Sequence, residues 1–300
     1  MSTFKNITLI AASGTLGSVA LHALISTGRF NIQVLRRAGS TSSFPSDVKV
    51  VDVDHSSSSA LQSAFEGQDV ILSFVPTLAT ESQLAFIDAA AAAGVQRFIP
   101  SEYSANLSNE RARGLPVFQP KVAVQDYLFE KVKTTGLSYT IIYGGAWLDA
   151  EGRSFLLDFD GDKGETRVYD GGDVPISVST LSTVADAIIG VLDHPAETHN
   201  RSIYVHDTVT TQNRLLELAR QLRRGKAWKM KNVSLEEMTA RSDERLAKGK
   251  LDMETFVPYI CRAIFDPGHG SVYERTDNEL LGIPGKTDED LMVVLDRVLQ

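Results

Sequence analysis

Residues 7–17 read ITLIAASGTLG. The apolar run Ile7–Ile10 predicts a buried strand, and the helical spacing over Leu16–Ser26 predicts a helix directly after it. A strand, a glycine-containing turn and a helix in this order form a dinucleotide-binding fingerprint, because the free N–H groups at the helix start face the pyrophosphate. We therefore expect a dinucleotide to contact the residues of the turn, which are Ala11, Ser13, Gly14, Thr15, Leu16 and Gly17.

Ala11 stands where this fingerprint usually has its first glycine. The two later glycines fit their usual roles: Gly14 lets the backbone approach the phosphates, and Gly17 lets the helix pack closely on the strand. A Cβ atom penalises the left-handed region that glycine visits freely. We therefore expect Ala11 to keep a negative φ.

The second predicted strand ends in Val34-Leu35-Arg36-Arg37. An NAD-binding protein usually carries an acidic residue there, which binds the ribose hydroxyls. Two guanidinium groups suit the 2′-phosphate of NADP instead. Arg36 and Arg37 thus predict NADPH as the cofactor, and the alternative is that both are solvated loop residues.

Short apolar runs alternate with longer helical patterns through the first half of the chain. The predicted strands cover residues 7–10, 32–35, 48–51, 70–74, 97–99 and 139–142, and the predicted helices cover 16–26, 60–65, 81–93 and 120–134. This alternation is typical of βαβ units, whose crossovers build a parallel sheet with helices on both faces. We expect an α/β protein with a doubly wound sheet of the Rossmann type.

The pattern changes to Gly- and Asp-rich segments after Trp147. We assign residues 1–150 to an NADP-binding domain and residues 151–300 to a smaller, mostly helical substrate lobe. Residues 174–207 contain a strand, a capped helix and a second strand, which predicts that the chain returns there to the first domain. The two units are therefore expected to be interleaved, with a cleft between them.

The composition excludes several classes of protein. The 300 residues include 30 Lys and Arg against 38 Asp and Glu, so the formal net charge of −8 disfavours binding along a nucleic acid backbone. The single cysteine, Cys261, excludes an intramolecular disulfide, and no metal site is expected. Neither a signal peptide nor an apolar run of about 20 residues is visible, which predicts a cytoplasmic protein without membrane contact. We expect a monomer or a homodimer that acts on a small molecule.

Three further segments resemble a known family. Residues 97–103 read RFIPSEY, Lys121 follows Pro120 at a predicted helix start, and residues 136–140 read GLSYT. Together with the glycine turn they resemble the atypical short-chain dehydrogenases of the NmrA-like and isoflavone reductase-like group, which includes the phenylcoumaran benzylic ether reductases. The resemblance covers most of the chain and implies an NADPH-binding Rossmann domain with a variable substrate domain.

The resemblance implies that Lys121 is the general acid or base beside the nicotinamide. A competing signal is Tyr127-x-x-x-Lys131, the spacing of the tyrosine and lysine in ordinary short-chain dehydrogenases. Tyr127 lies about 120° from Lys121 around a helix, so both cannot face one nicotinamide. The family frame places Val117 where the usual tyrosine would stand, and we favour Lys121.

Other candidates follow the ends of predicted strands, where ligands of open α/β sheets gather. Phe74, Val75, Pro76 and Ser101 are expected beside the cofactor, which Lys121 also contacts. The expected substrate-binding residues are Glu102, Tyr103, Tyr143, Trp147 and Phe155. Of these, Tyr143, Trp147 and Phe155 are expected to form an apolar wall.

The leading hypothesis is an NADPH-dependent reductase of a small aromatic or conjugated metabolite, with Lys121 as general acid or base. One alternative is a non-catalytic NADP-sensing regulator, which the Ala11 departure favours. A second alternative is a redox-neutral isomerase or lyase on the same fold.

Overall fold

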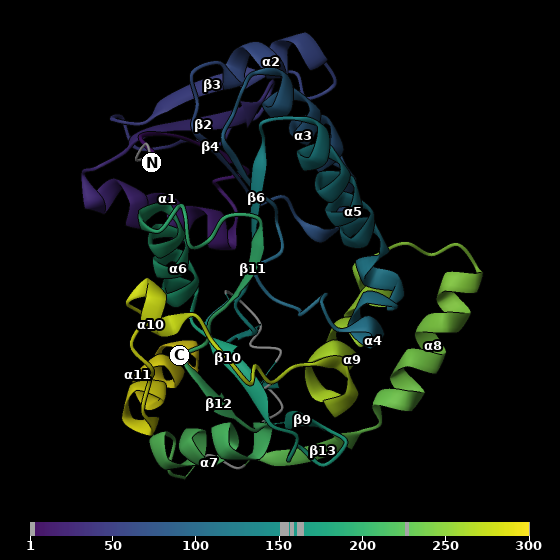
Figure 1. The fold of residues 1–300 in the computed structure, drawn as a ribbon. Helices are drawn as coiled ribbons and strands as arrows, with labels where there is room; N and C mark the ends of the chain where they lie inside the picture. The colour runs from purple at the N-terminus through teal and green to yellow at the C-terminus, as the bar shows by residue number, and fades with distance from the viewer. Residues whose placement is uncertain (1–3, 151–155, 157–158, 161–164, 226–227, 300) are drawn as a thin grey trace.

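A computed structural model of the chain describes residues 4–150, 156, 159–160, 165–225 and 228–299 (Figure 1). The strands are β1 (Asn6–Ile10), β2 (Asn31–Arg37), β3 (Lys49–Val53), β4 (Val70–Ser73), β5 (Arg97–Ile99), β6 (Ser138–Tyr143), β7 (Ala146–Trp147), β8 (Phe159–Asp160), β9 (Glu165–Tyr169), β10 (Ile176–Ser179), β11 (Arg201–Tyr204), β12 (Thr208–Thr210) and β13 (Lys229–Val233). The α-helices are α1 (Thr15–Thr27), α2 (Ser58–Phe65), α3 (Gln83–Ala92), α4 (Glu110–Arg113), α5 (Gln119–Thr134), α6 (Leu181–Asp193), α7 (Gln212–Leu222), α8 (Leu235–Ala247), α9 (Met253–Phe265), α10 (Asn278–Leu281) and α11 (Asp288–Val298). Three short 3₁₀ segments are η1 (Thr77–Ser82), η2 (Pro116–Phe118) and η3 (Pro267–His269).

A seven-stranded sheet organises the first lobe, with the strand order β11-β6-β5-β4-β1-β2-β3. Every pair of neighbours is parallel. The central strands β1 and β4 are buried on both faces, and β4 accordingly begins with three consecutive apolar residues rather than with an alternating pattern. The predicted α/β architecture with a doubly wound Rossmann-type sheet is confirmed.

Helices cover both faces of this sheet (Figure 1). On one face α1 packs against α6 through an apolar cluster that includes Leu21, Leu24 and Ile188. On the other face α2, α3 and α5 bury a second cluster, with Phe65 and Phe86 among its largest members. Because parallel strands all end at the same edge, the loops after β1, β4, β5 and β6 meet there.

The chain comes back to this sheet from the second half of the sequence. Thr180 caps α6 by accepting a hydrogen bond from the N–H of Thr183, and β11 then pairs with β6 at the edge of the sheet. β10, which lies inside the predicted return segment 174–207, instead joins a three-stranded sheet with β7 and β12. Only part of that segment therefore contributes to the seven-stranded sheet.

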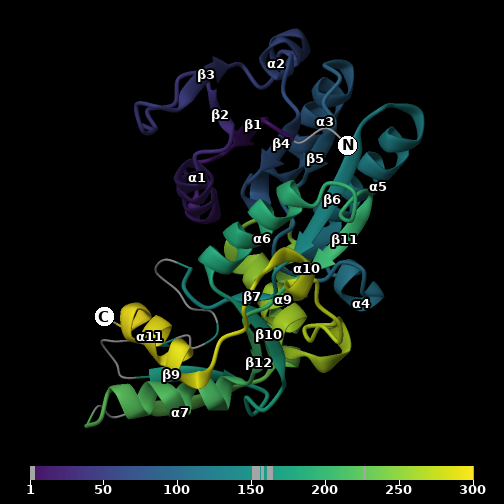
Figure 2. The same ribbon diagram turned by 60° about the vertical axis from the view of Figure 1, so that its left-hand side comes forward.

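The second lobe lies at one end of the large sheet, so that α2 and α7 stand at opposite ends of the molecule (Figures 1 and 2). It holds the β12-β10-β7 sheet and a second three-stranded sheet, β13-β9-β8. Helices α7, α9 and α11 bury its core, which includes Leu215, Phe265 and Leu295. Neither small sheet was predicted, because the strands are short and most of their pairings join segments that are distant in sequence.

Candidate functional site

A cavity of about 970 Å³ opens at the carboxyl edge of the large sheet. Its wall combines loops of the first lobe with helix α9 and β10 of the second lobe, so the two lobes build it together. From the first lobe come the turn after β1, the segment after β4, the segment after β5 and the start of α5. Most predicted site residues lie in this wall, namely Ala11, Ser13, Gly14, Thr15, Leu16, Gly17, Phe74, Val75, Pro76, Ser101, Glu102, Tyr103, Lys121 and Trp147.

The start of α1 forms one end of the cavity. Its N-cap residue is Gly14, no side chain caps the helix, and its first turn holds no acidic residue. The open N–H groups and the positive end of the helix dipole make this end suited to an anion such as a pyrophosphate. Ala11 has φ 58°, so the expectation of a negative φ was wrong. The turn requires the left-handed conformation here, and alanine adopts it at a cost of about 1 kcal/mol.

Gly17 is required by close packing. A Cβ atom added there would lie 2.6 Å from the Ala11 carbonyl oxygen and 2.9 Å from Ala12 Cα. Both neighbours are backbone atoms, so the turn itself would have to move. We expect Gly17→Ala to lower the free energy of unfolding by about 2 kcal/mol in urea denaturation.

The matched control is Gly136→Ala, because a Cβ at Gly136 would meet no atom within 4 Å. This control should change stability by less than about 0.5 kcal/mol. Equal stability of the two variants would show that the turn tolerates a side chain and would contradict the packing role of Gly17.

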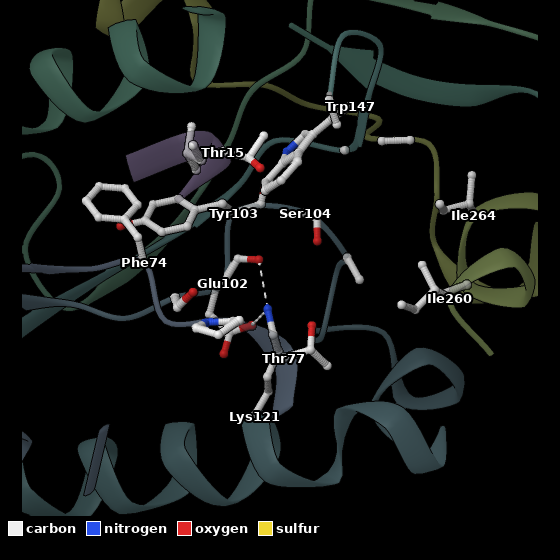
Figure 3. A pocket seen from close by; sticks show the side chains of 18 of the residues that line it. Thr15, Phe74, Thr77, Glu102, Tyr103, Ser104, Lys121, Trp147, Ile260 and Ile264 are labelled. Carbon is white, nitrogen blue, oxygen red and sulfur yellow. Dashed lines mark hydrogen bonds and ion pairs between the residues drawn. The ribbon is translucent and has the colours of Figure 1, made fainter. Parts of the chain in front are cut away.

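Lys121 lies in the first turn of α5 and reaches the loop after β5 (Figure 3). Its Nζ donates a hydrogen bond to the Glu102 carbonyl oxygen at 3.2 Å and lies 3.6 Å from Glu102 Oε2. The Glu102 side chain is fully buried, whereas that of Lys121 is 12% exposed. Burial raises the pKa of Glu102, and the nearby Lys121 charge opposes this rise. The two side chains form a buried ion pair in the cavity wall.

Tyr103 sits between this ion pair and the start of α1. Its ring stacks on Phe74 with a centroid distance of 5.2 Å, and burial raises its pKa well above the usual value. The residue has φ 30°, and its carbonyl oxygen accepts hydrogen bonds from the Gly144 N–H and the Trp147 indole. Within the described part of the chain, its buried hydroxyl group has no hydrogen-bond partner. A strained backbone and an orphaned buried hydroxyl both indicate a functional position.

The opposite end of the cavity is apolar. Figure 3 shows Thr15, Phe74 and Tyr103 on one side of Lys121, and Ile260 and Ile264 on the other. Further apolar residues in this wall are Leu78, Leu156, Ile176, Met253 and Ala263. Among the described lining residues, Glu102 and Lys121 are the only charged ones. The cavity therefore offers one end suited to an anion, one apolar end, and an ion pair between them.

Two predicted contacts lie away from this cavity. Arg36 binds both carboxylate oxygens of Asp52, at 2.6 and 2.7 Å, and donates to the Ser42 carbonyl oxygen. Arg37 is exposed, and neither arginine is part of the cavity wall. The structure thus leaves Arg37 available, while Arg36 already has a bidentate partner.

Tyr143 belongs to the core rather than to the predicted apolar wall. It is buried, packs against Tyr204 and accepts a hydrogen bond from Gln125 Nε2. Phe155 lies outside the described residues. Of the three aromatic residues predicted to form this wall, Trp147 is the one that lies in the cavity wall among the described residues.

The competing Tyr127 and Lys131 pair does not face the cavity. The Tyr127 hydroxyl donates to Asp88 Oδ1 at 2.5 Å, and Lys131 Nζ lies 2.5 Å from the same oxygen. Val117, at the position of the usual tyrosine, is buried in an apolar cluster. Lys121 is thus the candidate that reaches the cavity.

The contribution of α9 to the cavity wall was not predicted from the sequence. Ile260, Ala263 and Ile264 repeat at helical spacing, which does not distinguish a cavity wall from an ordinary core face. Tyr273, whose hydroxyl donates to the Ser104 carbonyl oxygen and accepts from the Gly145 N–H, was not predicted either. Tyr273 thereby ties the loop after β5 to the strand end after β6.

In the ranges that the structure describes, no group of three His, Cys, Asp or Glu side chains could hold a metal ion. No helix among those residues is long and apolar enough to span a bilayer.

Comparisons with known proteins agree with this geometry. The model of the NmrA-like family matches residues 3–253. The oxidoreductase aprR of Aspergillus flavus is 34% identical over 95% of this chain and 96% of its own length. The oxidoreductase poxI of Penicillium oxalicum is 28% identical over 96% of this chain and 92% of its own.

Solved structures with the same fold include two complexes with NADPH or NADP⁺. The leucoanthocyanidin reductase of Vitis vinifera with NADPH superimposes with a TM-score of 0.80 at 16% identity, covering 98% of this chain and 99% of that one. The protein AtPrR2 with NADP⁺ and (+)pinoresinol gives a TM-score of 0.76 at 19% identity, covering 98% and 100%. At these identities the likeness concerns the fold.

Proposed function

The chain belongs to the NmrA-like family, and from this premise we propose that it is an NADPH-dependent reductase of a small aromatic or conjugated metabolite. The observation that carries the proposal is the single cavity that joins the open start of α1, the Lys121 side chain and an apolar wall. A reductase needs these three parts together: a cofactor site, a proton donor or acceptor, and a substrate site. The oxidoreductase names of the relatives support the same class.

The residues at the α1 end fit NADPH. The uncapped N–H groups of Thr15, Leu16 and Gly17 would hold the pyrophosphate, and the orphaned Tyr103 hydroxyl would gain a partner from the bound cofactor. Phe74, Val75, Pro76 and Ser101 would line its nicotinamide end. Leucoanthocyanidin reductase, which has the same fold, is described in complex with NADPH. When bound, NADPH supplies a hydride from its nicotinamide ring.

Lys121 would donate or accept the proton of the reaction. Its Nζ lies at the cavity wall between the α1 end and the apolar end, held by the Glu102 carbonyl oxygen. A positioned proton donor or acceptor contributes about 10²- to 10⁴-fold to such reactions. The apolar wall of Trp147, Ile260 and Ile264 would exclude water and orient the substrate.

Arg37 is the residue on which the predicted preference for NADPH over NADH depends. Since Arg36 is held by Asp52, the exposed Arg37 is the arginine free to pair with the 2′-phosphate. We expect the wild-type protein to bind NADPH at least about tenfold more tightly than NADH, and Arg37→Ala to reduce this preference about tenfold. Calorimetric titration with both nucleotides measures the two ratios. Equal affinities in the wild-type protein would contradict this prediction, and so would an equal loss of both affinities in Arg37→Ala.

The proposed function is tested by adding NADPH with a panel of enones, imines and benzylic ethers and following the absorbance of the reduced nicotinamide. We expect NADPH oxidation that depends on one chemical class in the panel. Binding of NADPH without oxidation across the panel would favour the regulator. Product formation without net oxidation would favour a redox-neutral isomerase or lyase.

The domain boundaries, the cellular compartment and the oligomeric state are further parts of the proposal. We propose that residues 1–150 bind the cofactor, with 174–207 contributing in part, and that residues 151–300 supply the substrate wall. We further propose a cytoplasmic protein that acts as a monomer or a homodimer. Size-exclusion chromatography with light scattering would distinguish the two oligomeric states.

A further inference from the structure

Glu102 is unusual among the charged residues of this chain. Its side chain is fully buried at the cavity, and neither carboxylate oxygen has a hydrogen-bond partner within the described residues. A buried carboxylate without such partners is costly unless a nearby charge compensates it. Lys121 Nζ, 3.6 Å from Oε2, is the nearest such charge.

Few other groups around Glu102 compensate its negative charge. From α5, the Gln125 amide lowers the pKa of Glu102 less than the Lys121 charge does. The same amide donates to the Tyr143 hydroxyl and accepts from Arg113 Nη1. Arg113, next to α5 on α4, adds a weaker attraction and is itself paired with Asp126. The other titratable groups that feel the Glu102 charge are Tyr103 and Tyr143, and both phenols are buried. The charge of Glu102 is therefore balanced mainly by Lys121.

We propose that Glu102 is the counter-ion and positioning residue of Lys121, holding it as an ammonium group aimed into the cavity, so that Lys121 acts as a proton donor rather than as a base. This inference rests on the proposed function and deepens it. Before reaction the ion pair adds no net charge to the cavity wall, which suits a neutral substrate. During reduction the N–H bond of the ammonium breaks, its proton joins the anion that hydride addition creates, and Lys121 remains as a neutral amine.

The carbonyl oxygen of Glu102 supports the positioning role. It accepts the Lys121 hydrogen bond at 3.2 Å, so one residue fixes Nζ by both its backbone and its side chain. The conformation of this loop is in turn held by the Trp147 and Gly144 hydrogen bonds to the next carbonyl group, that of Tyr103. Replacing the Glu102 carboxylate by an amide therefore removes the charge and leaves the backbone contact in place.

The first test measures the reactivity of Lys121 in the protein without cofactor. Brief treatment with acetic anhydride at mildly alkaline pH modifies only neutral amines, and mass spectrometry quantifies the Lys121 product relative to Lys131. In Glu102→Gln we expect acetylation of Lys121 to rise about tenfold, because the ammonium form has lost its counter-ion. The matched control is Glu130→Gln, which removes an exposed carboxylate from the same helix. An unchanged rate for Lys121 in Glu102→Gln would overturn the proposal.

The second test measures stability and remains informative if Glu102→Gln folds poorly. In Lys121→Met the Glu102 carboxylate is buried without its counter-ion, which raises its pKa in the folded protein further above the unfolded value. The folded variant then holds the Glu102 proton up to a higher pH than its unfolded chain does. The variant is therefore most stable at low pH and loses stability as the pH rises through the pKa of the folded state. The loss of stability of Lys121→Met relative to the wild type should thus grow as the pH rises above the usual glutamate pKa of about 4.3. Lys121→Met/Glu102→Gln should abolish this growth. A deficit that does not depend on pH would contradict the counter-ion role.

Neither test depends on turnover. A negative result in either would therefore reject the role of Glu102 and leave the reductase proposal standing. A protein that never oxidises NADPH would reject the reductase proposal, even where both tests show the ion pair.

Discussion

Replacement of Lys121 by methionine is expected to lower kcat/KM for NADPH oxidation about 10³-fold, because the proton donor is lost while most of the cavity wall is kept. Methionine matches the unbranched length of the lysine chain but cannot donate a proton. Because the pyrophosphate would be held at α1 rather than at α5, the affinity for NADPH should fall by less than about tenfold. Steady-state kinetics and calorimetric titration separate the two effects.

Two controls come from the face of the same helix that is turned toward α3. Tyr127→Phe and Lys131→Met alter the pair that resembles the ordinary short-chain dehydrogenase spacing, and both residues bind Asp88 rather than facing the cavity. We expect both variants to keep turnover close to that of the wild type. Retained turnover in Lys121→Met together with loss in Tyr127→Phe would reverse the assignment.

Arg97→Met is expected to lower the free energy of unfolding by about 4 kcal/mol, because several buried acceptors lose their donor. Arg97 is 2% exposed. Its guanidinium donates to Ser138 Oγ at 2.6 Å, to Thr140 Oγ1 at 2.7 Å and to the Pro195 carbonyl oxygen at 2.9 Å. Burial lowers the pKa of Arg97 to about 10, so it stays charged at neutral pH. It thus joins β5 and β6 to the connection between α6 and β11.

Arg29→Met provides the comparison at the surface. Arg29 makes two hydrogen bonds to the carboxylate of Asp193, and its side chain is 46% exposed. Its replacement should cost less than about 1 kcal/mol in urea denaturation at neutral pH. If Arg97→Met were as stable as Arg29→Met, the buried network would not hold the returning strand in place.

Arg97 also shows what the sequence could and could not predict. Its position in a short strand was predicted from the apolar run around it. Its buried charge was not, because its partners Pro195 and Thr198 lie about a hundred residues further on and carry no local signal. The small sheets of the second lobe were not predicted for a similar reason. The paired strands β9 and β13, for example, lie far apart in the sequence.

The residues of the candidate site likewise fall into two groups, those that the sequence could predict and those that it could not. The glycine turn and the strand ends at Phe74 and Ser101 were predictable, because strand order brings them to one edge of the sheet. Lys121 was predicted from the family resemblance. The bidentate partner of Arg36 and the core position of Tyr143 depend on side-chain packing and could not be read from spacing. The left-handed conformation of Ala11 was also mispredicted, because the turn imposes it despite the Cβ atom.

The most direct test of the central claim uses NADPH that carries deuterium at C4 of the nicotinamide, prepared separately for each face of the ring. The wild-type protein is incubated with the labelled cofactor and the substrate panel, and products are analysed by mass spectrometry. The account predicts that deuterium from one face only appears on a product carbon, at a rate that falls about 10³-fold in Lys121→Met. Tight binding of NADPH with no deuterium in any product, from either face, would contradict it.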